Sequence, residues 1–180
     1  DRVTGRILDA KAKIYFKNMR LNLIKNVKTT TYIESSGHLY GVLDLIRELI
    51  PESKIIYIVR DPRTWIRSAL NTEEYLLYGP YDIKFLNKHI QAGDFDEDPY
   101  YNRWNQLTKF EKYCWYYNNL NKIVFKQIDN LSKVKVYRYE DLLLGDSREE
   151  TFTDMLDYMT SFNKNLQKYH LQPEMLNKKV

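Results

Sequence analysis

Cysteine, glycine and proline are scarce in this sequence, and long apolar runs are absent from it. Among its 180 residues there is one cysteine, Cys114, so no disulfide can form within the chain and a cysteine-rich metal site is excluded. No apolar run approaches the roughly 18 residues of a membrane span, and no signal peptide opens the chain. These absences favour a cytoplasmic protein without a membrane span. A content of 43% hydrophobic and 29% charged residues is typical of one globular domain.

An excess of charge of one sign is also missing. The formal net charge of +4 is too small to indicate nucleic-acid binding by itself. A nucleic-acid binder would need a basic face laced with aromatic side chains, and the acidic segment "DFDEDP" at residues 94–99 argues against one. We therefore expect no nucleic-acid partner.

Hydrophobic patterning predicts a series of alternating strands and helices. Residues 55–59 form a continuous apolar run without alternation, as expected of a parallel strand that is covered on both faces. The rest of the pattern predicts helices over residues 1–26, 39–50, 61–70, 109–128 and from 147 onward, and strands over 29–33 and 133–139. This order predicts a single α/β domain over residues 1–180, in which helices flank a parallel sheet.

The helix predicted over residues 109–128 has an apolar face that should point into the core. The residues on that face are Phe110, Tyr113, Cys114, Tyr117, Leu120 and Val124. We therefore expect Phe110 and Tyr113 to be buried alike, and Cys114 to serve in packing.

Residues 72–107 have little periodicity and are predicted to form a long irregular insertion. So long a loop in a compact domain is usually functional or mobile. We expect this one to form the mobile part of the acceptor side, which is the side of a binding site where a second substrate would bind. Two interpretations of its aromatic residues stay open, an aromatic pocket or simple packing of the insertion. The residues concerned are Tyr75, Tyr78, Tyr81, Tyr100, Tyr101 and Trp104.

Arg60 follows the predicted strand at 55–59 directly, and Ser68 lies eight residues further on. Asp61 is a favourable helix N-cap and Pro62 a favourable first helical residue. Ligands of open α/β sheets collect at the carboxyl ends of the strands, and a guanidinium and a hydroxyl near a helix N-terminus suit a phosphate. The alternative is that Asp61 and Pro62 merely start a helix while Arg60 forms a surface ion pair.

Four blocks of sequence, in order, resemble the sulfotransferases that use 3'-phosphoadenosine 5'-phosphosulfate (PAPS). The block "IIYIVRDPRTWIRSALN" resembles their 3'-phosphate-binding motif, and "VYRYEDLL" resembles a strand-end motif whose tyrosine packs on the adenine. "YIESSGHLYGVLDLIRELIPESK" and "WNQLTKFEKYCWYYNNLNKI" resemble the preceding strand and helix and the long helix of bacterial members. The resemblance covers about residues 29 to 160. It implies that Arg60 and Ser68 hold the 3'-phosphate, and that Tyr139 contacts the adenine.

The resemblance also implies the activity and the fold. Members transfer a sulfuryl group from PAPS to a hydroxyl or amine of a small-molecule or glycan acceptor, leave 3',5'-bisphosphoadenosine (PAP) and need no metal. The fold implied is a parallel sheet like that of the P-loop NTPases. Glu34 occupies the place of a catalytic base in some members, and His38 lies near that of a catalytic histidine in others. The alternatives are a solvated or helix-capping Glu34 and a structural or exposed His38.

One element of the family pattern is not found in this sequence. A Gly-Thr-Thr-type loop for the 5'-phosphosulfate normally precedes the four blocks, and residues 1–28 contain no such sequence. We therefore expect a sulfotransferase domain without its first strand and P-loop, which binds PAP weakly and transfers sulfate undetectably. An exposed sheet edge should make it prone to self-association. The competing hypothesis is a non-catalytic module that binds the nucleotide or another chain.

Overall fold

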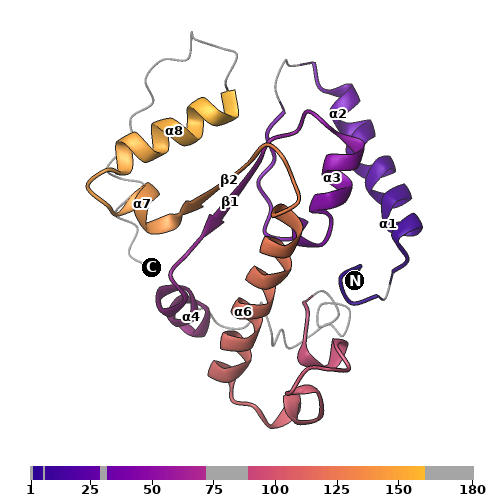
Figure 1. The fold of residues 1–180 in the computed structure, drawn as a ribbon, viewed down its shortest axis with the longest axis vertical. Helices are drawn as coiled ribbons and strands as arrows, with labels where there is room; N and C mark the ends of the chain where they lie inside the picture. Colours follow the sequence, from indigo (N-terminus) through magenta and orange to yellow (C-terminus); the bar gives the residue numbers. More distant parts are fainter. Residues whose placement is uncertain (1, 6, 29–31, 72–88, 161–180) are drawn as a thin grey trace. The chain divides into compact units, whose positions relative to one another are not determined.

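The computed structural model describes residues 2–5, 7–28, 32–71 and 89–160. These residues form a mixed α/β structure that is mostly helical and contains a two-stranded parallel sheet (Figure 1). The chain divides into two compact units. The sheet unit consists of residues 54–68 and 133–180, and the helical unit consists of residues 1–53 and 69–132. The predicted α/β class and parallel pairing are confirmed at this level.

The sheet unit is built on two strands that run in the same direction. Strand β1 spans Ile55–Val59 and strand β2 spans Val134–Arg138, with Ile55 opposite Val134 and Val59 opposite Arg138. A helix follows the carboxyl end of each strand: α4, Pro62–Asn71, follows β1, and α7, Tyr139–Leu143, follows β2 (Figure 1). Helix α8, Arg148–Thr160, completes the described part of this unit.

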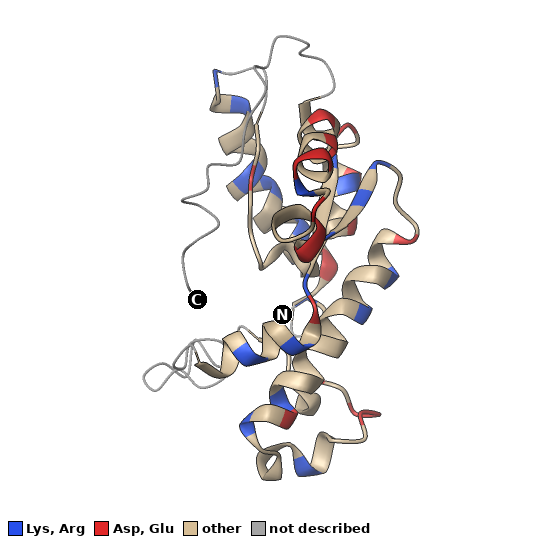
Figure 2. Ribbon diagram, turned by 90° about the vertical axis from the view of Figure 1, so that its left-hand side faces the viewer, with Lys and Arg blue, Asp and Glu red and all other residues tan. Residues whose placement is uncertain are grey.

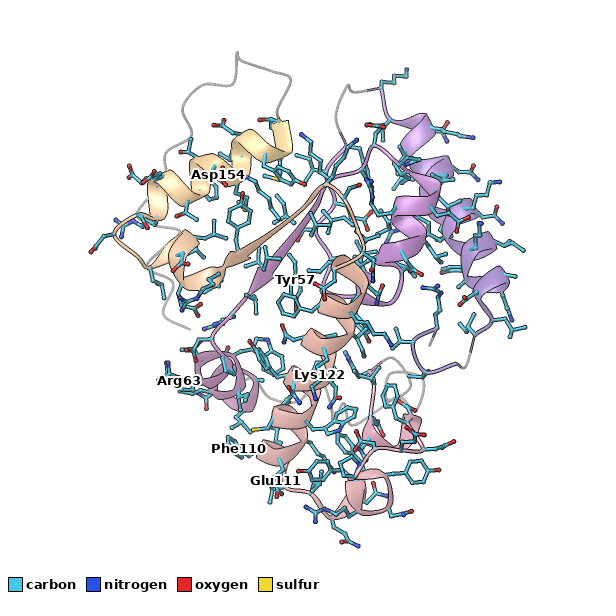
Figure 3. The ribbon with its side chains drawn as sticks, viewed as in Figure 1. Tyr57, Arg63, Phe110, Glu111, Lys122 and Asp154 are labelled. Atoms are coloured by element: carbon cyan, nitrogen blue, oxygen red, sulfur yellow. The ribbon has the colours of Figure 1, made fainter. Side chains whose placement is uncertain are left out.

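The core of the sheet unit holds α7 and α8 against the strands. Tyr137, Leu142 and Met155 are buried together, and Ile56, Leu143, Phe152 and Met159 pack around them. Asp154 of α8, labelled in Figure 3, accepts hydrogen bonds from Lys135 at 2.8 Å and from the Tyr137 hydroxyl at 2.5 Å. These bonds lower the pKa of Asp154. Helix α8 is thus fixed to β2 by both apolar packing and charge.

The helical unit contains the remaining described elements. They are α1 (Asp9–Phe16), a π-helical turn (Lys17–Leu21), α2 (Asn22–Asn26), α3 (Leu43–Leu49), α6 (Lys109–Ile128) and 3₁₀ turns at Leu39–Gly41, Ala92–Asp94 and Tyr101–Gln106. The helices predicted within 1–26, 39–50 and 109–128 are therefore confirmed. Tyr32 and Ile33, at the end of the strand predicted over 29–33, are not in a strand, and residues 29–31 lie outside the described residues. None of the described helices combines the length and apolarity needed to cross a bilayer.

Helix α6 buries a somewhat different face from the one that its sequence predicts. A capping box starts the helix, because Thr108 and Glu111 exchange hydrogen bonds. Tyr113 is 1% exposed as expected, whereas Phe110, one turn earlier, is 55% exposed (Figure 3). The buried face instead includes Trp115, whose indole donates to Asp98 at 2.8 Å. Partners from residues 89–107 thus draw this side of the helix inward, and the periodicity of the helix alone contains no information about them.

The described part of the predicted insertion is packed onto α6. Trp104 is 8% exposed and meets Trp115 edge to face at a ring-centroid distance of 5.0 Å. Ile90 and Ala92 are also buried. For Trp104 these contacts favour the packing interpretation. The tyrosines at 75, 78 and 81 lie outside the described residues, so the role proposed for residues 72–107 stays a prediction.

A partly buried ion pair joins the first residues of the chain to α3. The Arg2 guanidinium donates to both carboxylate oxygens of Asp44, each at 2.6 Å, and to Asp9 at 2.8 Å. Partial burial opposes ionisation of Asp44, but the hydrogen bonds and charge of Arg2 outweigh it, so the pKa of Asp44 is lowered. The fork-to-fork geometry favours a net contribution to stability.

Asp44→Asn should lower the free energy of unfolding by about 1–2 kcal/mol at neutral pH, the range for a charged hydrogen bond discounted for partial exposure. Because the folded-state pKa of Asp44 is depressed, this contribution is present above the unfolded value of about 3.9 and is lost as pH falls through the folded value. Urea unfolding at pH 7 and at pH 3 should therefore show a gap between parent and variant that closes in acid. Asp9→Asn is the matched control, since the Asp9 side chain is 76% exposed. A gap that persists unchanged in acid would contradict the assignment.

Candidate functional site

Side-chain contacts join the two segments just beyond the ends of the parallel strands. The last ladder pair is Val59 with Arg138. The next residues of the two segments are Arg60 and Tyr139, and the Arg60 guanidinium lies over the Tyr139 ring, 4.8 Å from its centroid. In the following pair, the Asp61 amide donates to Glu140 Oε1 at 2.9 Å across the same separation of 79 positions. The candidate site thus lies where the ladder ends, at the carboxyl ends of both strands.

Arg60 is held at this edge by the first turn of α4. Its Nε donates to the Thr64 hydroxyl at 3.2 Å, and that hydroxyl donates to the Asp61 carbonyl at 3.0 Å. The Tyr139 ring supports the guanidinium from another side, in a cation–π contact. Arg60 is half-buried, so its side chain is restrained without being removed from solvent. The structure therefore places Arg60 over the start of α4, between Thr64 and the Tyr139 ring.

Asp61 caps helix α4, as the sequence predicts. Its Oδ1 accepts from the Arg63 backbone amide at 2.8 Å, and the Arg63 guanidinium donates to both carboxylate oxygens. These hydrogen bonds hold the pKa of Asp61 far below its usual range and raise that of Arg63. The Arg63 side chain is 88% exposed and points outward from α4 (Figure 3). Arg63 thus neutralises the cap carboxylate, while Arg60 occupies the strand-end position.

Ser68 lies two turns into α4 and is half-buried. It follows Thr64 by four residues, so the two hydroxyls share one face of the helix. Because Arg60 Nε binds Thr64, the guanidinium lies on that same face. Arg60, Thr64 and Ser68 therefore line one side of α4, although the convergence of Arg60 and Ser68 on one anion stays a prediction. This helix also contains Arg67, and Figure 2 shows the basic residues along it in blue.

The two predicted catalytic residues, Glu34 and His38, lie in the helical unit. Glu34 accepts from the Tyr32 hydroxyl at 2.9 Å and pairs with Arg20 at 3.0 Å, and its side chain is 22% exposed. It is therefore neither freely solvated nor a helix cap among the described elements. His38 is exposed, immediately before the 3₁₀ turn at 39–41, and its ring centroid lies 5.9 Å from that of His89.

The chemistry of the strand-end cluster is that of an anion and aromatic-ring site. Arg60 supplies a cation, Thr64 and Ser68 supply hydroxyls, and Tyr139 supplies a ring against which a planar group can stack. The described residues contain no group of three or more His, Cys, Asp or Glu side chains that could hold a metal ion. A phosphorylated compound with an aromatic base matches the donor set of this cluster.

Two members of the cluster, Thr64 and Glu140, are not among the site residues predicted from the sequence. Thr64 lies four positions from both Arg60 and Ser68, and this spacing is the signal that could have identified it. Glu140 follows Tyr139, and its bond to Asp61 depends on strand register, which no local pattern reveals. Helix α7 itself has five residues, too few for a periodic signal.

Comparison of this chain with protein-family models, with curated proteins and with solved structures gives no match.

Proposed function

We propose that this chain is a PAPS-dependent sulfotransferase domain whose sheet is of the P-loop-NTPase-like type, and that it acts in the cytoplasm. One observation carries the proposal. Arg60 lies over Tyr139 at the carboxyl ends of two parallel strands, and these are the residues to which the sequence resemblance assigns the 3'-phosphate and the adenine. The resemblance supplies the reaction class, and the geometry of the sheet unit supports the nucleotide site.

In this proposal the nucleotide is bound by its two ends. Arg60 and Ser68 hold the 3'-phosphate at the face of α4, where the helix N-terminus adds a favourable dipole. Tyr139 offers one ring face to Arg60 and the other to the adenine. Glu140 and Arg63 do not contact the nucleotide: Glu140 binds the Asp61 amide, and Arg63 neutralises the Asp61 carboxylate.

The transfer step moves a sulfuryl group from the phosphosulfate of PAPS to an acceptor oxygen or nitrogen. The S–O bond to the 5'-phosphate breaks, PAP leaves with that oxygen, and the acceptor loses a proton. We propose Glu34 as the group that takes this proton, with Arg20 and the Tyr32 hydroxyl orienting its carboxylate. His38 is the weaker candidate for the same role. The acceptor is a small molecule or glycan, and we assign residues 72–107 to its side of the site.

Arg60→Ala should weaken PAP binding by about 1.5–3 kcal/mol, or tenfold to a hundredfold, because it removes a charged hydrogen-bond donor from the 3'-phosphate. Isothermal titration calorimetry of PAP and of adenosine 5'-phosphate should show the loss for PAP alone, since only PAP has a 3'-phosphate. Arg67→Ala is the matched control: it removes one charge from the same helix at an exposed position. Ser68→Ala should produce a smaller loss in the same direction.

The outcomes separate the hypotheses. Equal affinities of parent and Arg60→Ala for PAP would contradict the anchoring role. An equal loss of affinity for both nucleotides would show that Arg60 does not contact the 3'-phosphate. PAP binding that depends on Arg60 is expected of both the sulfotransferase domain and the non-catalytic module, because this chain is expected to transfer sulfate undetectably. Transfer of labelled sulfate from PAPS to any acceptor would exclude the non-catalytic module.

A further inference from the structure

Glu140 connects the two segments that form the strand-end cluster. It lies in the first turn of α7, and its Oε1 accepts the Asp61 amide at 2.9 Å. Its other oxygen, Oε2, is buried, and no donor from the described part of the chain reaches it. The carboxylate therefore accepts one well-formed hydrogen bond from a backbone amide, and its second oxygen has no donor among the described residues.

The carboxylate has one unfavourable and one favourable consequence for stability. Its buried Oε2, which has no donor in the described structure, is unfavourable, whereas an apolar side chain of similar size would avoid that penalty but leave the Asp61 amide without its acceptor. The bond from Oε1 satisfies the Asp61 amide, which precedes the helical residues of α4. The structural consequence of Glu140 thus lies in where it holds Asp61, because the rest of α7 is fixed by Leu142 in the core.

We infer that Glu140 is a positioning residue that sets the Arg60 guanidinium over Tyr139. Arg60 immediately precedes Asp61, and Tyr139 immediately precedes Glu140. The bond from the Asp61 amide to Glu140 therefore fixes the backbone on both sides of the cation–π pair. Without it, the junction between β1 and α4 can rotate, and the guanidinium leaves the ring. The inference deepens the proposed nucleotide site and rests on it only for the binding measurement.

Matched variants on α7 test this role in the 180-residue chain. Glu140→Ala removes the acceptor, Glu140→Gln keeps an acceptor oxygen at the same reach, and Glu140→Asp keeps the charge but withdraws the oxygens by about one bond length of 1.5 Å. Asp141→Ala and Asp141→Asn are the controls. Asp141 is the next residue of the same helix, its side chain is 50% exposed, and it forms a 4.0 Å ion pair with Arg138.

The first measurement needs no nucleotide. In ¹H–¹⁵N spectra of the free protein, we expect a ring-current shift from Tyr139 at the Arg60 Nε–H resonance, and at the Asp61 amide the shift of a hydrogen bond to a carboxylate. Glu140→Ala and Glu140→Asp should abolish the Arg60 ring-current shift. Glu140→Gln should retain it, and both Asp141 variants should leave it unchanged. An Arg60 resonance unaffected by Glu140→Ala and by Glu140→Asp would overturn the inference. If the Glu140→Ala variant does not fold, the Arg60 resonance of Glu140→Asp alone tests the inference.

The second measurement joins the inference to binding. If the parent binds PAP, Glu140→Ala should weaken that binding about tenfold, with rescue by Glu140→Gln to within about twofold of the parent. A melting temperature that falls while PAP affinity stays constant would reduce Glu140 to a structural residue and overturn the inference. If the parent does not bind PAP, the proposed function fails, and the spectral test still decides the positioning role by itself.

Discussion

Leu142→Ala should lower the free energy of unfolding of the sheet unit by about 2–5 kcal/mol, the range for truncating a buried leucine. Leu142 is 2% exposed and packs with Tyr137 and Met155. Truncation leaves a cavity between α7, β2 and α8, and the rigid interior fills it only in part. Urea unfolding followed by far-UV circular dichroism measures the loss.

Leu144→Ala is the matched control for that measurement. Leu144 lies two residues further on and is 64% exposed, so its truncation should change stability by less than about 0.5 kcal/mol. Similar losses for the two variants would contradict the packing of α7. Because α7 begins with Tyr139 and Glu140, Leu142→Ala should also weaken PAP binding at temperatures where the protein is still folded.

Tyr113→Ala should produce the second large effect, a loss of about 3–5 kcal/mol in the helical unit. Tyr113 is 1% exposed on α6, whereas Phe110 on the same helix is 55% exposed. The sequence places both residues on one apolar face. Comparing the two variants therefore tests whether the structure or the periodicity identifies the buried residues of α6. Phe110→Ala should cost less than about 1 kcal/mol, because little area is removed from water in the folded state.

The pair of variants can fail in an informative way. If Phe110→Ala destabilises the chain as much as Tyr113→Ala, then the first turn of α6 is covered in solution and the periodic face predicted by the sequence is the buried one. Fluorescence of Trp115, which is buried on α6 and bonded to Asp98, provides a local probe that should respond to Tyr113→Ala more strongly than to Phe110→Ala.

Local sequence predicts where the helices and strands of this chain lie better than it predicts which face of each one is buried. The strand at 55–59, the Asp61 cap and the length of α6 are local properties, and the structure confirms each of them. The predicted cover on both faces of that strand is wrong at Ile58, which is 46% exposed. The burial of Trp115 and the exposure of Phe110 depend on contacts from residues 89–107, which are distant from α6 in the pattern. The sequence pattern does not predict helix α7, because its five residues are too few to show a helical periodicity.

The same distinction applies to the candidate site. The strand-end position of Arg60 and the place of Ser68 on the capped helix have a local signature, while their binding of one anion stays a prediction. The contact of Arg60 with Tyr139 and the bond of Asp61 to Glu140 need the register of two strands that are far apart in sequence. Glu34 could be named as a base, but its pairing with Arg20 required the structure.

The separation of 79 positions between paired residues of β1 and β2 has a consequence for synthesis. When the ribosome has completed Arg60, its partner Tyr139 does not yet exist. At about 5–20 residues per second, about 4–16 seconds pass before Tyr139 is added. During that interval the apolar strand β1 has no neighbour in the described sheet, and the segment being made is residues 69–132 of the helical unit. Closing so long a loop is entropically costly and slow. The nascent chain therefore passes through a stage in which β1 is exposed to chaperones or to other strands, and the strand-end cluster is among the last parts of the described structure to form.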